Sequence, residues 1–343
     1  MEGLERRELL AGEPWGPGPR LIDHWAAVRQ HPGLTGAGQA IAVIDTGVDY
    51  GHPVLGKGFG AGHKVVAGYD FVENDGNPSP GELGHGTGVA GVLAAEPYVY
   101  RGLRYQGIAT GAEIVALRAE TPAQVKRALR WVANHRELYN ITAVNLTDFS
   151  PARGPTVYAA ELRQLARKDV FIGTPAGNNG PDVPPQWPAR DPSVVAVGAV
   201  NFRDQLTGFS QRGAAVEMLA PGENVTIPFW VAGRHTYSSY ADGTSWATPN
   251  VVGAAVLLRQ VNAELTNAQI VAILRASGVE KHDNLGNTYE RLDLDGAIKL
   301  AYRRSAAAGV AARGVELFAA GSDGGRDDKR SVFNSQKRIV AGD

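Results

Sequence analysis

The sequence contains no cysteine among its 343 residues, which excludes disulfide bonds, thiolate metal sites and a cysteine nucleophile. An excess of charge is also lacking, because 34 Lys and Arg residues face 35 Asp and Glu residues and leave a formal net charge of −1. This balance provides no electrostatic basis for binding nucleic acid or an anionic membrane surface. No apolar run approaches the roughly 18 residues of a membrane span, and residues 1–30 lack the basic-then-apolar pattern of a signal peptide.

Glycine and apolar residues are plentiful. The chain holds 43 Gly and is 43% hydrophobic, so it can bury a large core, and one α/β domain with extensions is favoured over two equal domains. Residues 1–20 are charged and then rich in Gly and Pro, which is typical of an arm. We therefore predict an arm over 1–20, one domain over 21–304, and a linker and tail over 305–343, in which 315–319 and 331–340 have strand-like composition.

Short apolar runs alternate with helical patterns along the middle of the chain. Continuous apolar runs predict strands over 39–44, 113–118, 142–146, 170–174 and 194–199, in the manner of parallel strands covered on both faces. Helices are predicted over 21–30, 84–95, 157–168 and 244–260, with two more capped by Thr121 and Thr266, the second ending at Gly278. This alternation predicts a doubly wound, mostly parallel sheet with right-handed crossovers.

Asp45, His85 and Ser245 each stand between small residues. They belong to the segments Ile41-Ala-Val-Ile-Asp-Thr-Gly47, Gly84-His-Gly-Thr-Gly-Val-Ala-Gly91 and Gly243-Thr-Ser-Trp-Ala-Thr-Pro249. A serine hydroxyl becomes a nucleophile when an imidazole takes its proton and a carboxylate orients the imidazole. Each segment alone is as well explained by a turn or a helix cap, but the set of three indicates a catalytic triad. Ser245 begins a helix, so its backbone N–H can face an anion.

The order Asp, His, Ser distinguishes this triad from those of chymotrypsin and the α/β-hydrolases. Together with Ala176-Gly-Asn-Asn-Gly180, the three segments resemble the subtilisin-like serine peptidases (subtilases) over about residues 21–304. The resemblance implies a three-layer subtilisin-like fold, a catalytic domain over 21–304 and a serine endopeptidase that forms an acyl-enzyme. It also implies that Asn178 donates to the oxyanion, and that the substrate is bound by Thr147, Asp148, Phe149, Pro175, Ala176 and Gly177.

The strand that binds the substrate departs from the family pattern. Where subtilases usually have Asn-x-Ser-Leu-Gly-Gly, this chain has Asn145-Leu-Thr-Asp-Phe-Ser150. Extended peptides bind through free backbone groups and open side-chain pockets, so Asp148 and Phe149 are expected to reshape or partly block the S1 and S4 region. Alternatively, the loop turns Phe149 outward. Pro175 stands where an alanine usually lines S1.

The resemblance also bears on calcium. The family's His-Pro-Asp-Leu, whose Asp is a ligand of the strong calcium site, reads His52-Pro-Val-Leu55 here, so Val54 removes a hard oxygen ligand. The acidic run of Asp70, Glu73, Asp75 and Asn77 could bind a cation, but it has the composition of a turn. We predict no metal ligands, and calcium binding stays open.

Two other functions remain open. A subtilase-fold binding or surface protein could have a remodelled, poorly active cleft, and an esterase is disfavoured because the Gly-x-Ser-x-Gly motif is absent. The resemblance implies polypeptide substrates, a propeptide that is not part of this chain, and a secreted or cell-surface location, with a cytoplasmic one as the alternative.

Overall fold

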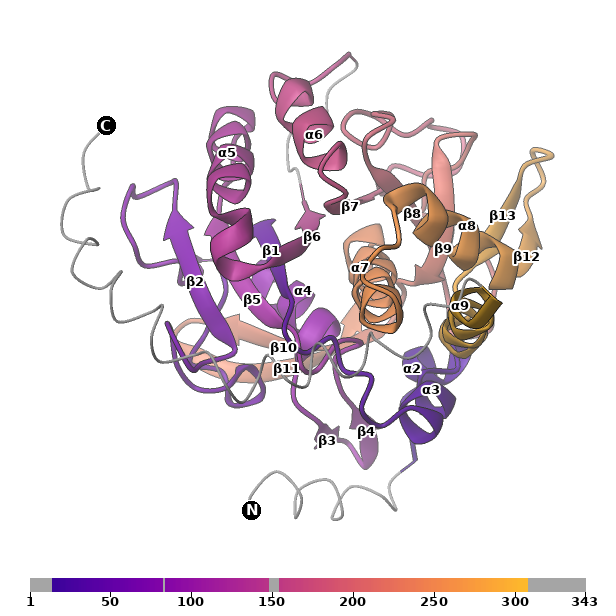
Figure 1. Ribbon diagram of the computed structural model, residues 1–343, viewed down its shortest axis with the longest axis horizontal. Helices are drawn as coiled ribbons and strands as arrows, with labels where there is room; N and C mark the ends of the chain where they lie inside the picture. The colour runs from indigo at the N-terminus through magenta and orange to yellow at the C-terminus, as the bar shows by residue number, and fades with distance from the viewer. Residues whose placement is uncertain (1–13, 83, 148–153, 308–343) are drawn as a thin grey trace.

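A nine-stranded sheet forms the centre of the computed structural model, which describes residues 14–82, 84–147 and 154–307 (Figure 1). Its strand order is β12-β13-β9-β8-β7-β6-β1-β5-β2, and the β12–β13 pair is antiparallel while the others are parallel. The strands are β1 (Ala40–Asp45), β2 (Val65–Asp70), β5 (Glu113–Arg118), β6 (Ile141–Leu146), β7 (Phe171–Pro175), β8 (Val195–Val200), β9 (Val216–Pro221), β12 (Val279–His282) and β13 (Thr288–Arg291). The predicted doubly wound, mostly parallel sheet is confirmed.

Helices cover both faces of this sheet. They are α2 (Pro17–Leu21), α3 (His24–Gln30), η1 (Pro53–Leu55), α4 (His85–Ala94), α5 (Pro122–Tyr139), α6 (Ala159–Ala166), α7 (Thr244–Val261), α8 (Asn267–Ser277) and α9 (Leu294–Ala307). Figure 1 shows α5 and α6 on one side of the sheet and α4 and α7 on the other. Successive residues of β1 alternate between two hydrophobic cores, since Ile41 and Val43 pack with α4 and α7, whereas Ala42 and Ile44 pack with α5. This arrangement is the three-layer α/β fold expected from the sequence.

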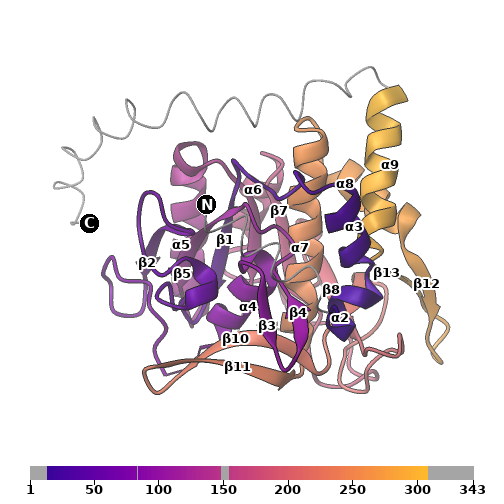
Figure 2. The ribbon, with the colours of Figure 1, turned by 90° about the horizontal axis from the view of Figure 1, so that it is seen from below.

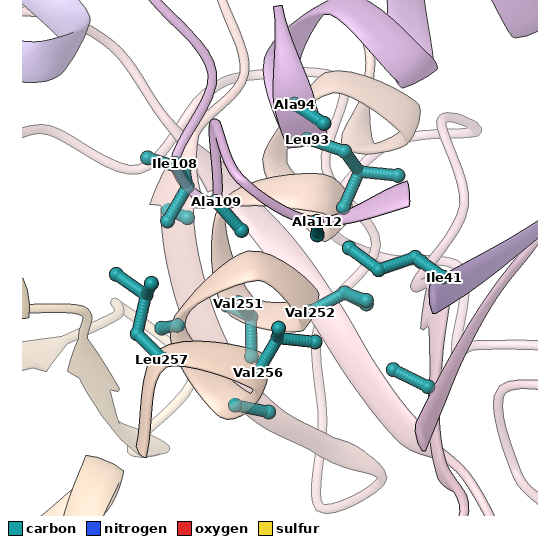
Figure 3. Packing of buried hydrophobic residues seen from close by; sticks show 14 of the residues in the cluster. Ile41, Leu93, Ala94, Ile108, Ala109, Ala112, Val251, Val252, Val256 and Leu257 are labelled. Carbon is teal, nitrogen blue, oxygen red and sulfur yellow. The ribbon is translucent and has the colours of Figure 1, made fainter. Parts of the chain in front are cut away.

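The central helix α7 is buried along all of its 18 residues. Its Val251, Val252, Val256 and Leu257 lie in the core with Ile108, Ala109 and Ala112 (Figure 3). Because such a helix is surrounded by protein, its first residues are held firmly, and Ser245 is one of them.

Two hairpins lie outside the main sheet. They are β3 (Tyr98–Tyr100) with β4 (Leu103–Tyr105), and β10 (Val225–Val231) with β11 (Arg234–Ala241). Figure 2 shows β10 and β11 crossing the molecule beside α4, and β10 contacts that helix. Neither hairpin was predicted from the sequence, nor were β2, β9, β12, β13 and α9.

The two predicted helix caps are confirmed in detail. Thr121 and Thr266 each form a capping box with the Gln three residues later, at the starts of α5 and α8. Of the helix expected over 21–30, residues 24–30 form α3, whereas α2 ends at Leu21. Asp23 between the two helices adopts a left-handed conformation with φ of 54°.

The division into residues 1–20, 21–304 and 305–343 stays a prediction, and the strand-like runs 315–319 and 331–340 lie outside the described residues. Helix α9 extends to Ala307, three residues beyond the predicted boundary. Among the helices of the described ranges, none combines the length and the apolar character that crossing a membrane would require.

Candidate active site

Asp45 and His85 are in direct contact. Asp45 ends β1 and is fully buried, and His85 is the first residue of α4, with its side chain 20% exposed. The imidazole Nδ1 is 2.8 Å from Asp45 Oδ1 and 3.0 Å from Oδ2. The Thr46 backbone N–H also donates to Asp45 Oδ1, at 2.7 Å. Since Nδ1 faces the carboxylate, Nε2 on the far side of the ring is directed away from it.

Two glycines of the motifs permit this approach. Gly47 has φ of +96°, and a Cβ atom there would lie 2.6 Å from the Ser79 carbonyl oxygen. A Cβ atom on Gly86 would lie 3.0 Å from Asp45 Cβ and would collide with the Gly47 carbonyl oxygen. A larger residue at position 86 would separate the first turn of α4 from the end of β1, and one at position 47 would displace the backbone of residues 78–80.

Ser245 is the second residue of α7 and is 9% exposed. The residue before the helix, Gly243, has φ of 151°, which favours glycine. Asn178 is tied to this helix start, because its Oδ1 accepts hydrogen bonds of 2.9 Å from both the backbone N–H and the hydroxyl of Thr244. The Gly177 N–H donates in turn to the Thr244 hydroxyl, at 3.2 Å. With its carbonyl end held in this way, the Asn178 side chain has its two N–H groups at the other end.

Trp246 joins the starts of α7 and α4. Its ring centroid is 4.6 Å from that of His85, so the residue that follows Ser245 lies against the imidazole. Trp246 was not predicted as a site residue from the sequence, although its position directly after the candidate nucleophile was a signal.

The predicted substrate-binding residues occupy the same edge of the sheet. Thr147 directly follows β6 and donates its N–H to the Ile44 carbonyl at 3.0 Å, while Pro175 ends β7. Ala176 and Gly177 come next, so these four residues gather at the carboxyl ends of strands near Asp45, where open α/β sheets bind ligands. Asp148 and Phe149 lie outside the described residues.

The acidic run is engaged with the protein itself. Arg118 donates to Asp70 at 2.8 Å and to Glu73 at 3.1 Å. Asp75 accepts the Asn77 N–H at 2.9 Å, as in a turn. In the parts of the chain that the structure describes, no three His, Asp or Glu residues form a group that could hold a metal ion.

A lysine lies near Val54. The buried Val54 accepts a hydrogen bond from the Glu96 N–H at 2.8 Å, and Lys64 Nζ is 3.2 Å from Glu96 Oε1. Lys64 also donates to the Thr110 carbonyl, and burial lowers the pKa of its ammonium group. The Glu96 carboxylate opposes that effect.

The β10–β11 hairpin is attached to the turn after Asp45. His235 Nδ1 is 2.6 Å from Asp49 Oδ2, and the Asp49 N–H donates to the Thr87 hydroxyl in α4 at 2.9 Å. The ring of His52 is 3.1 Å from the Thr236 carbonyl. These contacts link residues up to 186 positions apart, so no local sequence pattern predicts them.

Comparisons with known proteins identify the family of this chain. A family profile described as the Subtilase family matches residues 36–293. The alkaline protease of Alkalihalobacillus alcalophilus is 32% identical over 277 residues, which cover 78% of this chain and 65% of that protein. Subtilisin Savinase of Lederbergia lenta is 32% identical over 265 residues, which cover 75% of this chain and 88% of that protein.

Two solved structures are also similar. A cold-adapted subtilisin-like serine proteinase aligns with a TM-score of 0.62 at 30% identity, covering 75% of this chain and 89% of its own. MycP1 with the N-terminal propeptide removed aligns with a TM-score of 0.67 at 26% identity, covering 82% of this chain and 96% of the MycP1 chain. The chain belongs to the subtilase family, and it spans about 65% of the length of the alkaline protease.

Proposed function

We propose that this chain is a serine endopeptidase that hydrolyses peptide bonds through an acyl-enzyme. The observation that carries the proposal is the 2.8 Å contact between His85 Nδ1 and Asp45. The His85 ring also lies against Trp246, the residue that follows Ser245. The kinship to proteases at 32% identity supports the same activity.

In the proposed mechanism, His85 Nε2 accepts the Ser245 proton while the Ser245 oxygen forms a bond to the substrate carbonyl carbon. Asp45 accepts the Nδ1 proton in a hydrogen bond, which keeps the required tautomer and stabilises the imidazolium. The tetrahedral intermediate then loses its amine, which takes the proton from Nε2. Water, activated by the same base, releases the acid and restores Ser245.

Two donors are proposed to stabilise the negative oxygen of the intermediate. One is the Ser245 N–H, among the unpaired donors at the start of α7. The other is the Asn178 amide, whose Oδ1 is occupied by two hydrogen bonds from Thr244, so that its N–H end is available for the oxyanion. A preorganised donor pair of this kind lowers the barrier because it forms its full interaction only once charge develops.

The proposed substrates are extended polypeptides that pair with the end of β6. Thr147, Pro175, Ala176 and Gly177 would form the wall of the cleft around the residue before the scissile bond. The sequence Asp148-Phe149 in place of small residues favours small side chains at P1 and P4.

The residues around Val54 do not fit the calcium ion that the family implies there. Val54 supplies no carboxylate, and the Lys64 ammonium group lies 3.2 Å from Glu96, where it would repel a divalent cation. We propose that this part of the fold is stable without calcium. A propeptide and a secreted or cell-surface location stay predictions from the family resemblance.

The experiment that tests the function is mass-spectrometric mapping of new termini in a denatured protein mixture incubated with the chain. We expect cleavage at many sites, which a serine-directed fluorophosphonate abolishes. The alternative, a binding protein with a poorly active cleft, has no support in the comparisons, and it would be indicated if no new termini formed.

A further inference from the structure

The indole of Trp246 lies directly beside the imidazole of His85. The two ring centroids are 4.6 Å apart and the ring planes are inclined by 39°. Trp246 is 7% exposed, so the indole itself is nearly closed to solvent. The imidazole is therefore bounded by the Asp45 carboxylate at its Nδ1 edge and by an aromatic ring beside it.

The six-membered ring of the indole packs tightly against α4, and the Nε1 end lies next to Gly243. A Cβ atom on Gly88, about one turn after His85 in α4, would lie 2.7 Å from Trp246 Cζ3 and 2.8 Å from Ile227 Cδ1. The six-membered ring fits at this place because Gly88 has no side chain. At the other end, Trp246 Nε1 is 3.6 Å from the position of a Cβ on Gly243. The close approach to Gly88 limits how far the indole can move relative to α4 and therefore relative to His85.

This placement supplies two things that a general base requires. The hydrogen bond to Asp45 positions Nδ1, but it leaves the ring free to tilt about that bond, and the indole limits the tilt. In addition, the imidazole becomes a cation when it takes a proton, and a cation near the face of an aromatic ring is attracted by the ring quadrupole.

We propose that Trp246 is a positioning residue for His85, which holds the plane of the imidazole and stabilises the imidazolium formed when Ser245 loses its proton. The inference rests on the proposed function, because it requires that His85 acts as the base. It adds to that function a fourth side chain that acts through the triad.

Among the residues that the structure describes, few charged groups lie on the elements around this ring. Asp45 at the end of β1 contacts the imidazole itself. His235 of β11 is paired with Asp49, and Arg259 of α7 donates to the Thr142 carbonyl near the far end of the helix. Neither β10 nor the rest of α4 has another titratable side chain. Substitution of Trp246 removes none of these groups.

The test compares Trp246→Leu and Trp246→Phe with the wild type, using a p-nitroanilide peptide with alanine before the scissile bond. The value of kcat/KM is measured from pH 5 to pH 9. At the alkaline plateau we expect Trp246→Leu to lower kcat/KM by about 2- to 30-fold. Its acid limb should move to lower pH by roughly 0.4 to 1.5 units, because the protonated imidazole is stabilised less. Phe retains an aromatic face, so kcat/KM and the acid limb of Trp246→Phe should lie between those of the wild type and Trp246→Leu.

The matched control is Trp131→Leu, which removes a tryptophan stacked on His135 at 3.9 Å in α5, on the other side of the sheet. We expect it to leave both the plateau and the acid limb unchanged. The inference is overturned if Trp246→Leu lowers the melting temperature but leaves the pH profile unmoved, or if Trp131→Leu shifts it equally. If Trp246→Leu does not fold, the inference is overturned when the acid limb of Trp246→Phe stays at the wild-type pH. Absence of hydrolysis by the wild type would instead reject the proposed function, and this inference with it.

Discussion

The buried histidine of α3 is expected to make the fold sensitive to acid. His24 is 1% exposed, and neither ring nitrogen has a hydrogen-bond partner within the described ranges 14–82, 84–147 and 154–307. Its ring packs edge-on to Trp15 with centroids 5.2 Å apart and lines a cavity of about 100 Å³ together with Arg104. Burial, assisted by the charge of Arg104, lowers the pKa of His24 to about 3.

The direction of the effect follows from the two states. An unfolded chain binds a proton on histidine below about pH 6.5, whereas folded His24 resists the proton until about pH 3. His24 therefore leaves the stability of the fold unaffected above pH 6.5 and lowers it progressively as the pH falls from 6.5 toward 3. At pH 5 this one group lowers the free energy of unfolding by about 2 kcal/mol relative to pH 8. For a domain of this size, the loss corresponds to a melting temperature about 3 °C lower.

The assay is urea unfolding at pH 8 and pH 5, followed by tryptophan fluorescence, in a Ser245→Ala background that prevents self-digestion. His24→Leu replaces the ring by an apolar side chain of similar size, so about 2 kcal/mol of the acid destabilisation should disappear. His282→Leu, on an exposed part of β12, is the control and should retain the full acid effect. If the free energy of unfolding falls equally between pH 8 and pH 5 with His24 present and with His24→Leu, the reasoning is refuted.

Three further predictions concern the site. Asn178→Leu should lower kcat about 10²- to 10³-fold with little change in KM, the magnitude that loss of the oxyanion-hole asparagine has in subtilisin itself. An unchanged kcat in steady-state kinetics would show that Asn178 does not stabilise the oxyanion. Thermal unfolding with excess EDTA should match that with millimolar calcium, because Val54 supplies no carboxylate and the nearby Glu96 carboxylate is paired with Lys64. A large calcium-dependent rise in melting temperature would contradict this. Phe149→Gly should raise kcat/KM for peptides with Phe at P1 more than for those with Ala, since a ring removes pocket volume; equal effects would show that Phe149 points away from the cleft.

Much of the fold was predictable because local signals and tertiary structure agree. The strands β1, β5, β6, β7 and β8 are buried on both faces, so each is a continuous apolar run in the sequence. Such runs identify strands without an alternation of polar and apolar residues. Thr121 and Thr266 indicated their helices through capping interactions that act over one turn. The relation of Asp45 to His85 was predicted from their motifs, and the structure places the two side chains in contact.

The remaining features depend on contacts that no local pattern encodes. The outer strand β11 is largely polar and only partly buried, so it lacks the apolar run that identified the central strands. Ala232-Gly233 at its turn was nevertheless a usable signal. The pairing of His235 with Asp49 and the contact of Trp246 with His85 join segments more than 150 residues apart. Such contacts follow from the packing of α4, α7 and the hairpin rather than from the residues alone.

The most direct measurement of the central claim is peptide hydrolysis by Ser245→Ala beside Ser239→Ala, a serine of β11 six residues earlier. We expect Ser245→Ala to lose activity by about 10⁶-fold, the loss that removal of the nucleophile causes in subtilisin itself, and to resist fluorophosphonate labelling. It should keep the wild-type melting temperature to within a few degrees, since a hydroxyl at a cleft contributes chemistry rather than packing. Ser239→Ala should retain wild-type rates and labelling. Wild-type hydrolysis by a folded Ser245→Ala protein would contradict the assignment of the nucleophile and, with it, the proposed catalytic triad.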